Sequence, residues 1–306
     1  MKVSENVIIQ VLQAGYGDCI FISIQKENQL FNILIDGGLA STYFNARERR
    51  TPSGVLKILL DKLKAEDDHI DLLICTHVDD DHIGGIRKWF EMDFPLKDFV
   101  HEIWINDDMP IADKYDLNNT SGHAASIISK LKKQNITYQN GIVSGFSREN
   151  VFCSIHVIAP SIEHHNVIAH DIHESLNNAS SEKKNNKKTF LQLIQEKWEM
   201  KDITSENDAS IAFEMECWDG TKLLLLGDAG YQDYMEGLNL LHPGIDERIE
   251  YDVVKLSHHG SKNNFHPDFL KRICSPYYIV STNGVKFKHP DKDVLAQIIC
   301  NTDSVI

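Results

Sequence analysis

The residues best suited to chemistry stand together in one short segment, Thr76-His77-Val78-Asp79-Asp80-Asp81-His82-Ile83-Gly84-Gly85. Neutral imidazole and ionised carboxylate are good ligands for divalent metal ions. The segment follows a buried apolar run at residues 70–75, and a tight turn after a strand can direct alternate side chains to one point. The predicted metal ligands of this segment are His77 and Asp79 for one ion, and Asp81 and His82 for a second.

The acidic part of this segment also has a plainer interpretation. A run of three aspartates alone is typical of a solvated loop. Two histidines flank this run, however, and it lies between a predicted buried strand and the pair Gly84-Gly85. Those glycines let the backbone turn without placing a side chain in the site. The pattern therefore favours a two-metal hydrolytic site over a surface loop.

Two other polar groups follow apolar runs in the second half of the chain. Asp228 comes after four consecutive leucines, and His258-His259 come after the run at residues 251–256. Alone, such an aspartate is typical of a turn, and such a histidine pair is typical of a surface or a helix end. Loops at strand ends are nevertheless where a rigid sheet holds chemical groups open to solvent. Both groups are therefore candidates for the same chemistry.

The elements that must position these groups are strands in both halves of the chain, with helices between them. Apolar or alternating runs predict strands at residues 7–12, 19–24, 31–35, 70–75, 103–105, 151–158, 210–215, 222–226, 251–256 and 277–281. Apolar groups at helical spacing predict helices at residues 54–64, 86–90, 124–133, 190–199 and 293–299. A glycine-bearing turn between the first two strands predicts that they pair as a hairpin. The predicted fold class is α/β.

Residues 161–206 differ from the rest in being rich in His, Asn, Lys and Glu, including the run Ser-Glu-Lys-Lys-Asn-Asn-Lys-Lys. We interpret this stretch as an inserted helical segment or lid within a single domain that spans residues 1–306. Its histidines (His164, His165, His170 and His173) are better explained as a polar face than as a further metal site.

Composition and charge restrict the classes of function. The net charge of −14 argues against a surface that grips nucleic acid by neutralising phosphates, although metal ions and local lysines would still serve a nucleic-acid enzyme. The six cysteines are scattered with no C-x-x-C pair, which argues against a structural zinc knuckle and a disulfide framework. No apolar run is long enough to span a bilayer, and the N-terminus does not resemble a secretory signal. A cytoplasmic protein without membrane association is expected.

The first segment resembles the metal motif of the metallo-β-lactamase superfamily, His-x-His-x-Asp-His, in the variant in which the second His is an Asp. That variant is typical of the soluble hydrolase domain attached to the DNA-uptake channel protein ComEC and of its stand-alone relatives. Further stretches that agree with this subgroup are residues 14–20 with 34–38, residues 223–228 and residues 253–262.

The resemblance implies a four-layer αβ/βα sandwich, in which two facing mixed sheets are covered by helices and the metals lie at one edge. It also implies that Asp228 bridges the two metals and that one histidine of the His258-His259 pair completes the second site. We assign His259 as the ligand and His258 as the substrate contact or proton donor, with the reverse order as the alternative. The residues predicted to take part in catalysis are Asp81, His258 and Lys262.

The third ligand of the first metal site is where this sequence departs from the superfamily pattern, because no histidine stands at the usual position. The candidates are Asn207, Asp208 and, from another loop, His123. His289, which with Pro290 matches a His-Pro pair seen in the subgroup, is a further candidate facing the cleft. Asp18 and Asp36, in glycine turns, are expected to brace the metal loop through backbone amides rather than bind metal.

The expected cofactors are two divalent metal ions, zinc or manganese, with magnesium as a further candidate. Asp79 replaces an imidazole by a hard oxygen ligand, which shifts preference toward manganese or magnesium. Such ions suit phosphodiester hydrolysis by a metal-bridging hydroxide, so the first hypothesis is a phosphodiesterase or nuclease, with phosphate held by Lys262 and also by Lys255, Lys286 or Lys288. The alternatives are a hydrolase of a small ester, lactone, phosphocholine or cyclic nucleotide, and a non-catalytic sensor or binding protein.

Overall fold

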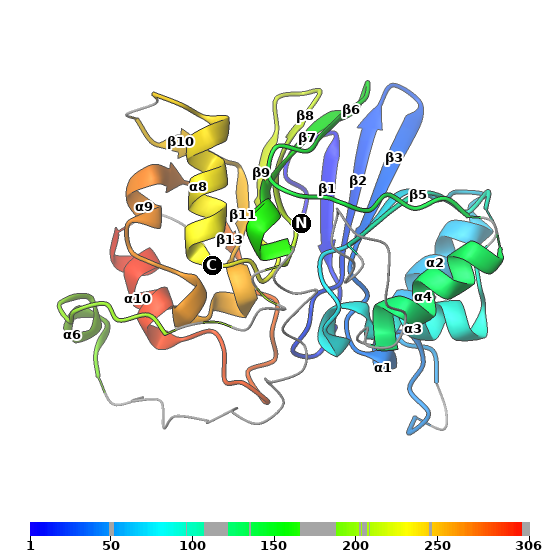
Figure 1. Cartoon of the computed structure of the whole chain (residues 1–306), viewed down its shortest axis with the longest axis horizontal. Helices are drawn as coiled ribbons and strands as arrows, with labels where there is room; N and C mark the ends of the chain where they lie inside the picture. The colour runs from blue at the N-terminus through cyan, green and yellow to red at the C-terminus, as the bar shows by residue number, and fades with distance from the viewer. Residues whose placement is uncertain are drawn as a thin grey trace. The chain divides into compact units, whose positions relative to one another are not determined.

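The computed structural model describes residues 1–48, 52–95, 97–106, 122–134, 136–165, 188–201, 203, 207, 209–244 and 247–301. The chain divides into two compact units. Unit 1 contains Met1–Ile142 and Cys217–Asp219, and unit 2 contains Val143–Glu216 and Gly220–Ile306. Each unit is built on its own sheet, and the element labels used below are those of Figure 1. That the chain forms a single domain stays a prediction.

Unit 1 contains a five-stranded sheet in the order β1-β2-β3-β4-β5. Its strands are β1 (Val7–Val11), β2 (Ile20–Lys26), β3 (Gln29–Ile35), β4 (Ile70–Cys75) and β5 (Val100–Ile105). The predicted hairpin is confirmed, because β1 and β2 pair antiparallel with Val7 opposite Ile24. Strands β3, β4 and β5 run parallel, so their carboxyl ends share one edge of the sheet.

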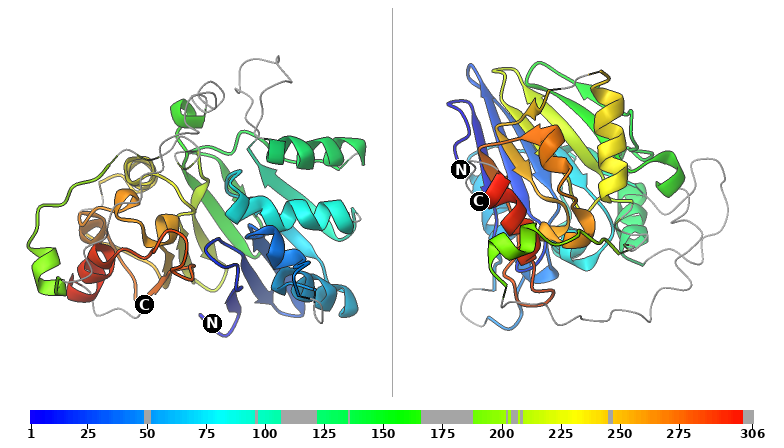
Figure 2. Two further views of the ribbon diagram at one scale, coloured as in Figure 1. Left: turned by 90° about the horizontal axis from the view of Figure 1, so that it is seen from below. Right: turned by 90° about the vertical axis from the view of Figure 1, so that its left-hand side faces the viewer.

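Three helices of unit 1 pack on this sheet: α2 (Val55–Ala65), α3 (Asp80–Met92) and α4 (Gly122–Lys133). Figure 2 shows the same arrangement from two further sides. The apolar spacing of α2 is explained by its buried face, where Leu56, Leu59, Leu60 and Leu63 join the core. A short helix α1 (Ala40–Tyr43) precedes them.

Helix α3 begins earlier than the sequence predicted. The predicted start was residue 86, whereas the helix begins at Asp80 with Asp79 as its N-cap. Carboxylates in the first turn of a helix are favoured by the helix dipole, which offsets the weak helix propensity of the Gly84-Gly85 pair. The glycines are needed for packing, because a Cβ at Gly85 would lie 2.0 Å from the backbone oxygen of Gly37. Half of the metal motif therefore lies on a helix rather than on a loop.

The close approach at Gly85 predicts that Gly85→Ala destabilises the protein. The new methyl group would clash with backbone atoms, and a change of side-chain rotamer cannot relieve that clash. We therefore expect the free energy of unfolding to fall by about 2–3 kcal/mol. Urea unfolding measures it, with Lys88→Ala on the same helix as the control, for which a change within about 0.5 kcal/mol is expected. Equal unfolding midpoints for the two variants would contradict the packing argument.

Unit 2 contains a six-stranded sheet in the order β13-β11-β9-β8-β7-β6. Its strands are β6 (Ser147–Glu149), β7 (Cys153–Ala159), β8 (Ala212–Cys217), β9 (Lys222–Leu225), β11 (Val253–Lys255) and β13 (Tyr277–Ile279). Strands β9, β11 and β13 are parallel. Their carboxyl ends therefore share one edge of the sheet. Asp228 comes shortly after the end of β9 at that edge, and the His258-His259 pair comes shortly after the end of β11. A separate parallel pair is formed by β10 (Ile249–Glu250) and β12 (Ile273–Cys274).

Three described helices of unit 2 share a core with the sheet through their apolar side chains: α8 (Tyr231–Leu241), α9 (Phe269–Arg272) and α10 (Lys292–Asn301). Of these, α10 contains the predicted helix at residues 293–299. Helix α8 was not predicted. Together with unit 1, this arrangement confirms the predicted mixed α/β fold with two main sheets.

The predicted insertion at residues 161–206 is described at 161–165, 188–201 and 203. Its helix α6 spans only Phe190–Ile194, shorter than the predicted 190–199, and it packs against α10. Beyond it, the indole N–H of Trp198 donates to the Phe265 carbonyl oxygen at 2.9 Å. The described part of the insertion therefore lies on unit 2, while His170 and His173 lie outside the described residues. None of the described helices combines the length and apolar character needed to cross a membrane.

Candidate metal centre

The first cluster of candidate ligands lies in unit 1, where the chain passes from β4 into α3. Asp36, fully buried at the end of β3, fixes this turn: it accepts the Thr76 backbone N–H at 2.8 Å and the Thr76 hydroxyl at 2.7 Å. The prediction that Asp36 braces the loop through a backbone amide is confirmed. The role of Thr76 was not predicted, because a threonine alone gives no indication of it.

The same carboxylate also orients His82. The Nδ1 atom of His82 lies 2.8 Å from Asp36 Oδ2, and both side chains are fully buried. A histidine that donates Nδ1–H to a carboxylate has its lone pair on Nε2, and this pairing is common for metal-binding histidines. Asp36 therefore favours the tautomer that leaves the Nε2 lone pair of His82 available for a metal ion.

The other predicted ligands of unit 1 lie beside His82. The ring centroids of His77 and His82 are 4.1 Å apart, and His77 Nε2 is 3.8 Å from Asp79 Oδ2. Asp81 is half-buried, and its carbonyl oxygen accepts the Asp18 backbone N–H at 3.1 Å. Two imidazoles with adjacent carboxylates on a buried turn form a donor set that fits a divalent ion.

The second cluster lies in unit 2, after β9. Asp228 is almost fully buried, and its backbone N–H donates to Ser210 Oγ at 2.9 Å. The ammonium of Lys255 donates to the Gly227 carbonyl oxygen at 2.9 Å and lies 3.8 Å from Asp228 Oδ1. Lys255 is itself only 1% exposed, so it is a positioning residue for the Asp228 turn and not the phosphate contact that the sequence suggested.

The His258-His259 pair faces Asp228 through a strained turn. The φ angles of His258 and His259 are 45° and 54°, a left-handed conformation that non-glycine residues seldom adopt and that concentrates at functional sites. The Nε2 atoms of His258 and His259 lie 3.8 Å and 3.7 Å from Asp228 Oδ2. The two histidines differ in exposure: the His259 side chain is 1% exposed and that of His258 is 23% exposed. The more accessible His258 is the one assigned to the substrate.

Three further side chains surround His258. Its Nδ1 atom lies 2.9 Å from Asn264 Oδ1 and 3.2 Å from Asn207 Nδ2, and its ring centroid is 5.3 Å from that of His289. Burial lowers the pKa of His258, while the Asp228 carboxylate acts in the opposite direction. Asn207 and His289, both candidates from the sequence, are therefore brought to His258. Asn264, fully buried, also donates to the Asp228 carbonyl oxygen at 2.9 Å, a contact that was not predicted.

The remaining predicted residues have other positions. The ammonium of Lys262 lies 3.0 Å from Asp293 Oδ1 and 4.9 Å from the centroid of the Trp198 ring, so within unit 2 it forms an ion pair and a cation–π contact. His123 is in the first turn of α4, and its side chain lies outside the described part of the chain, as does the whole of Asp208.

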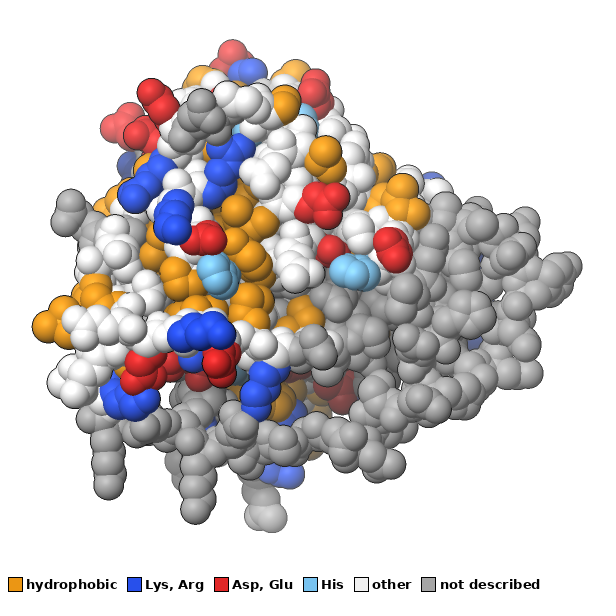
Figure 3. All heavy atoms as spheres, turned by 60° about the vertical axis from the view of Figure 1, so that its left-hand side comes forward, with side chains coloured by type: hydrophobic (Ala, Val, Ile, Leu, Met, Phe, Trp, Pro, Cys, Tyr) orange, Lys and Arg blue, Asp and Glu red, His pale blue; other side chains and the backbone are white. Residues whose placement is uncertain are grey.

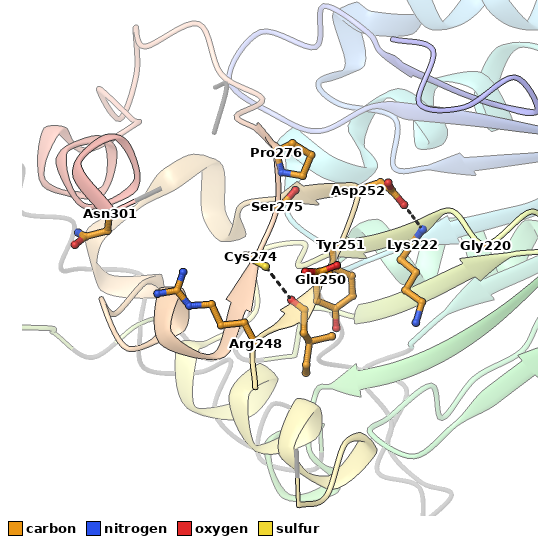
Figure 4. Close-up of a pocket in the computed structure, with 11 residues that line it drawn as sticks. Gly220, Lys222, Arg248, Glu250, Tyr251, Asp252, Cys274, Ser275, Pro276 and Asn301 are labelled. Carbon is orange, nitrogen blue, oxygen red and sulfur yellow. Dashed lines mark hydrogen bonds between the residues drawn. The ribbon is translucent and has the colours of Figure 1, made fainter. Parts of the chain in front are cut away.

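A hollow of about 790 Å³ lies in unit 2 away from the Asp228 cluster (Figure 4). Its lining includes Lys222, Asp252 and Ser275, which stand at the amino ends of β9, β11 and β13. The candidate ligands follow the carboxyl ends of the same strands, so this hollow is not the candidate active site. On the face shown in Figure 3, basic side chains lie among acidic and apolar ones, so that face is not a uniformly basic surface.

Comparisons with known proteins show similarity to one superfamily. Residues 13–96 match the family model of the metallo-beta-lactamase superfamily. The matched segment contains Asp36, His77 and His82, so the resemblance to this superfamily is confirmed there. Over 292 residues the chain is 24% identical to the ComE operon protein 3 of Bacillus subtilis (strain 168), a match that covers 94% of this chain and 30% of that protein. The chain thus spans less than a third of the length of this curated relative.

Solved structures with some similarity include a metallo-beta-lactamase and a diphosphatase. One from Pontibacter korlensis is 11% identical, with a TM-score of 0.36, over 80% of this chain and 86% of that one. A diphosphatase from the PhnP family is 11% identical, with a TM-score of 0.34, over 78% of this chain and 59% of that one. At TM-scores this low, neither likeness indicates a function for this chain.

Proposed function

We propose that this chain is a metal-dependent hydrolase that acts on phosphodiesters, with nucleic acid as the substrate class. The proposed metal ligands are His77, Asp79, Asp81 and His82 of unit 1 and Asp228 and His259 of unit 2. The observation that carries the proposal is the buried Asp36–His82 pair, which presents an imidazole Nε2 on the turn that matches the superfamily.

The donor set indicates which ions the ligands suit. Bound divalent ions would supply an activated water and stabilise the charge that develops on the attacked phosphorus. Asp79 stands where the superfamily motif has a histidine, so it adds a negative charge and a hard oxygen to the ligands of unit 1. Hard ligands favour manganese or magnesium more than an all-imidazole set does.

The chain's own residues would orient the ligands and contact the substrate. Asp36 fixes the His82 tautomer, and Lys255 holds the Asp228 turn while compensating its buried charge. His258, the more exposed histidine of its pair, is proposed to contact a phosphate oxygen or to move a proton to the leaving group. The resemblance to the hydrolase domain of a DNA-uptake channel protein supports nucleic acid as the substrate.

The test combines metal analysis with hydrolysis assays. Protein freed of metal with a chelator is reloaded with Mn²⁺, Mg²⁺ or Zn²⁺, and its bound metal is measured by elemental analysis. Cleavage of bis-p-nitrophenyl phosphate, single-stranded DNA and plasmid DNA is then measured. We expect metal-dependent cleavage of all three substrates, which Asp81→Ala abolishes.

Asp80→Ala is the matched control, since Asp80 is the exposed neighbour in the same helical turn and pairs with Arg87 at 3.1 Å. Cleavage of the small diester without cleavage of DNA would replace the nucleic-acid substrate by a small one. Equal activity of Asp81→Ala and the unaltered protein, or failure to retain metal, would overturn the hydrolase proposal.

A further inference from the structure

Unit 1 carries a second histidine–carboxylate cluster, which lies at the amino ends of two strands. His69 immediately precedes β4, Asp71 lies in β4, and His101 lies in β5, the edge strand of the sheet. Ile70 pairs with Val100 and Leu72 with Glu102, so Asp71 and His101 occupy neighbouring positions in register. Side chains two residues apart in an extended chain point to the same face, which brings His69 to the same place. The parallel pairing thus gathers two imidazoles and one carboxylate.

The distances within this cluster fit a single small ion. His69 Nε2 is 3.0 Å and His101 Nδ1 is 3.7 Å from the same atom, Asp71 Oδ1. One ligand atom from each of the three residues lies within 4.8 Å of the other two, and the imidazole centroids are 4.2 Å apart. Ligand atoms about 2.1 Å from a tetrahedral zinc ion are about 3.4 Å from one another, between the two distances to Asp71.

Hydrogen bonds from the neighbouring strand β3 also fix the cluster. Asn32, a buried residue of β3, donates its backbone N–H to Asp71 Oδ2 at 2.7 Å. Its side-chain amide donates to Asp68 Oδ1 at 3.0 Å and to the His69 carbonyl oxygen at 2.9 Å. The other ring nitrogen of His69, Nδ1, faces Asp68 at 3.8 Å. A fixed carboxylate and a histidine flanked by a second carboxylate are the surroundings that orient metal ligands.

We propose that His69, Asp71 and His101 form a zinc site separate from the candidate metal centre. Two imidazoles select zinc over magnesium or calcium, which prefer oxygen ligands. The three side chains leave a fourth position for water, since those of His101 and His69 are 47% and 33% exposed. The bound ion ties the edge strand β5 to the turn before β4.

Zinc binding by this cluster is tested with a variant that removes one ligand. Protein freed of metal is dialysed against buffered Zn²⁺, and zinc per chain is measured by mass spectrometry for the unaltered protein, His101→Gln and Asp228→Asn. We expect His101→Gln to lose about one zinc and to keep the zinc that Asp228→Asn loses. Affinity at this site should fall by more than about 100-fold, the upper limit for losing only an outer hydrogen-bond partner.

A control and a second measurement keep this test decisive. His156→Gln, in β7 and with its Nδ1 3.0 Å from Ser147 Oγ, should retain all of its zinc. In the unaltered protein, crystals grown with Zn²⁺ should show an anomalous peak between the three side chains. An unchanged zinc content of His101→Gln, or the absence of that peak, would show that the cluster is a set of histidine–aspartate ion pairs without a metal. Either result is independent of whether the protein hydrolyses phosphodiesters.

Discussion

Asp228→Asn is expected to reduce metal-dependent phosphodiester hydrolysis by about 1,000-fold or more, the upper range for loss of one stabilising group in an active site. The substitution keeps the shape of the side chain and the backbone N–H contact with Ser210, but it removes the charge that faces both His258 and His259. An amide is a poor ligand where a carboxylate is needed. The measurement is kcat/KM for bis-p-nitrophenyl phosphate at saturating Mn²⁺, together with metal content.

The matched control for this substitution is Asp252→Asn in the same sheet. Asp252 precedes β11 at the opposite end from the histidine pair, and its carboxylate accepts the Lys222 backbone N–H at 2.8 Å. The same loss of charge there should leave kcat/KM unchanged. If Asp228→Asn kept more than about a tenth of the activity, Asp228 would not be a metal ligand and the role of unit 2 would have to be reassigned.

The strands were predicted well because their signal is local. The run at residues 70–75 was predicted as a strand and forms β4 with the same limits, since a short apolar stretch bounded by polar residues has few alternatives.

Helix α8 was missed although Tyr231, Tyr234 and Leu238 stand at helical spacing. Gly237 interrupts that pattern. A glycine is needed there for tertiary packing, because a Cβ at residue 237 would lie 1.9 Å from the Ile158 carbonyl oxygen. Sequence alone does not show that a helical glycine serves close packing.

The candidate ligands could be proposed from residue type and motif, but their supporting contacts could not. Asn264 is linked to Asp228 across 36 residues of chain, a pairing that only the folded sheet creates. Lys262 shows the same limit: it stays a predicted phosphate contact, and its ion pair with Asp293, 31 residues away, could not be predicted from the sequence. Motifs identify side chains that can bind metal or take part in catalysis. The partners that orient or neutralise those side chains depend on the topology of the fold.

Asp36→Asn is expected to weaken metal binding by about 10–100-fold without unfolding the protein. Asparagine tolerates the left-handed conformation of residue 36, which has a φ of 56°, and its carbonyl oxygen still accepts the Thr76 backbone N–H. Its amide nitrogen donates and cannot accept a hydrogen bond from His82 Nδ1, so His82 is driven to the tautomer with the proton on Nε2. That tautomer has no lone pair to offer a metal through Nε2, and a comparable carboxylate-to-amide change beside a catalytic histidine acts through the wrong tautomer.

Thr76→Ser separates this tautomer effect from a general loosening of the turn. Serine keeps the hydroxyl that donates to Asp36 and removes only a methyl group, so metal affinity should stay close to that of the unaltered protein. Titration with Mn²⁺ and Zn²⁺ gives the affinities, and thermal unfolding in chelator gives the stability without metal. Metal affinity that is equal in Asp36→Asn and Thr76→Ser would show that the Asp36–His82 hydrogen bond does not set the ligand's tautomer. A lower affinity in Asp36→Asn, with similar stability of the metal-free proteins, would tie metal binding to the proton on one nitrogen of His82.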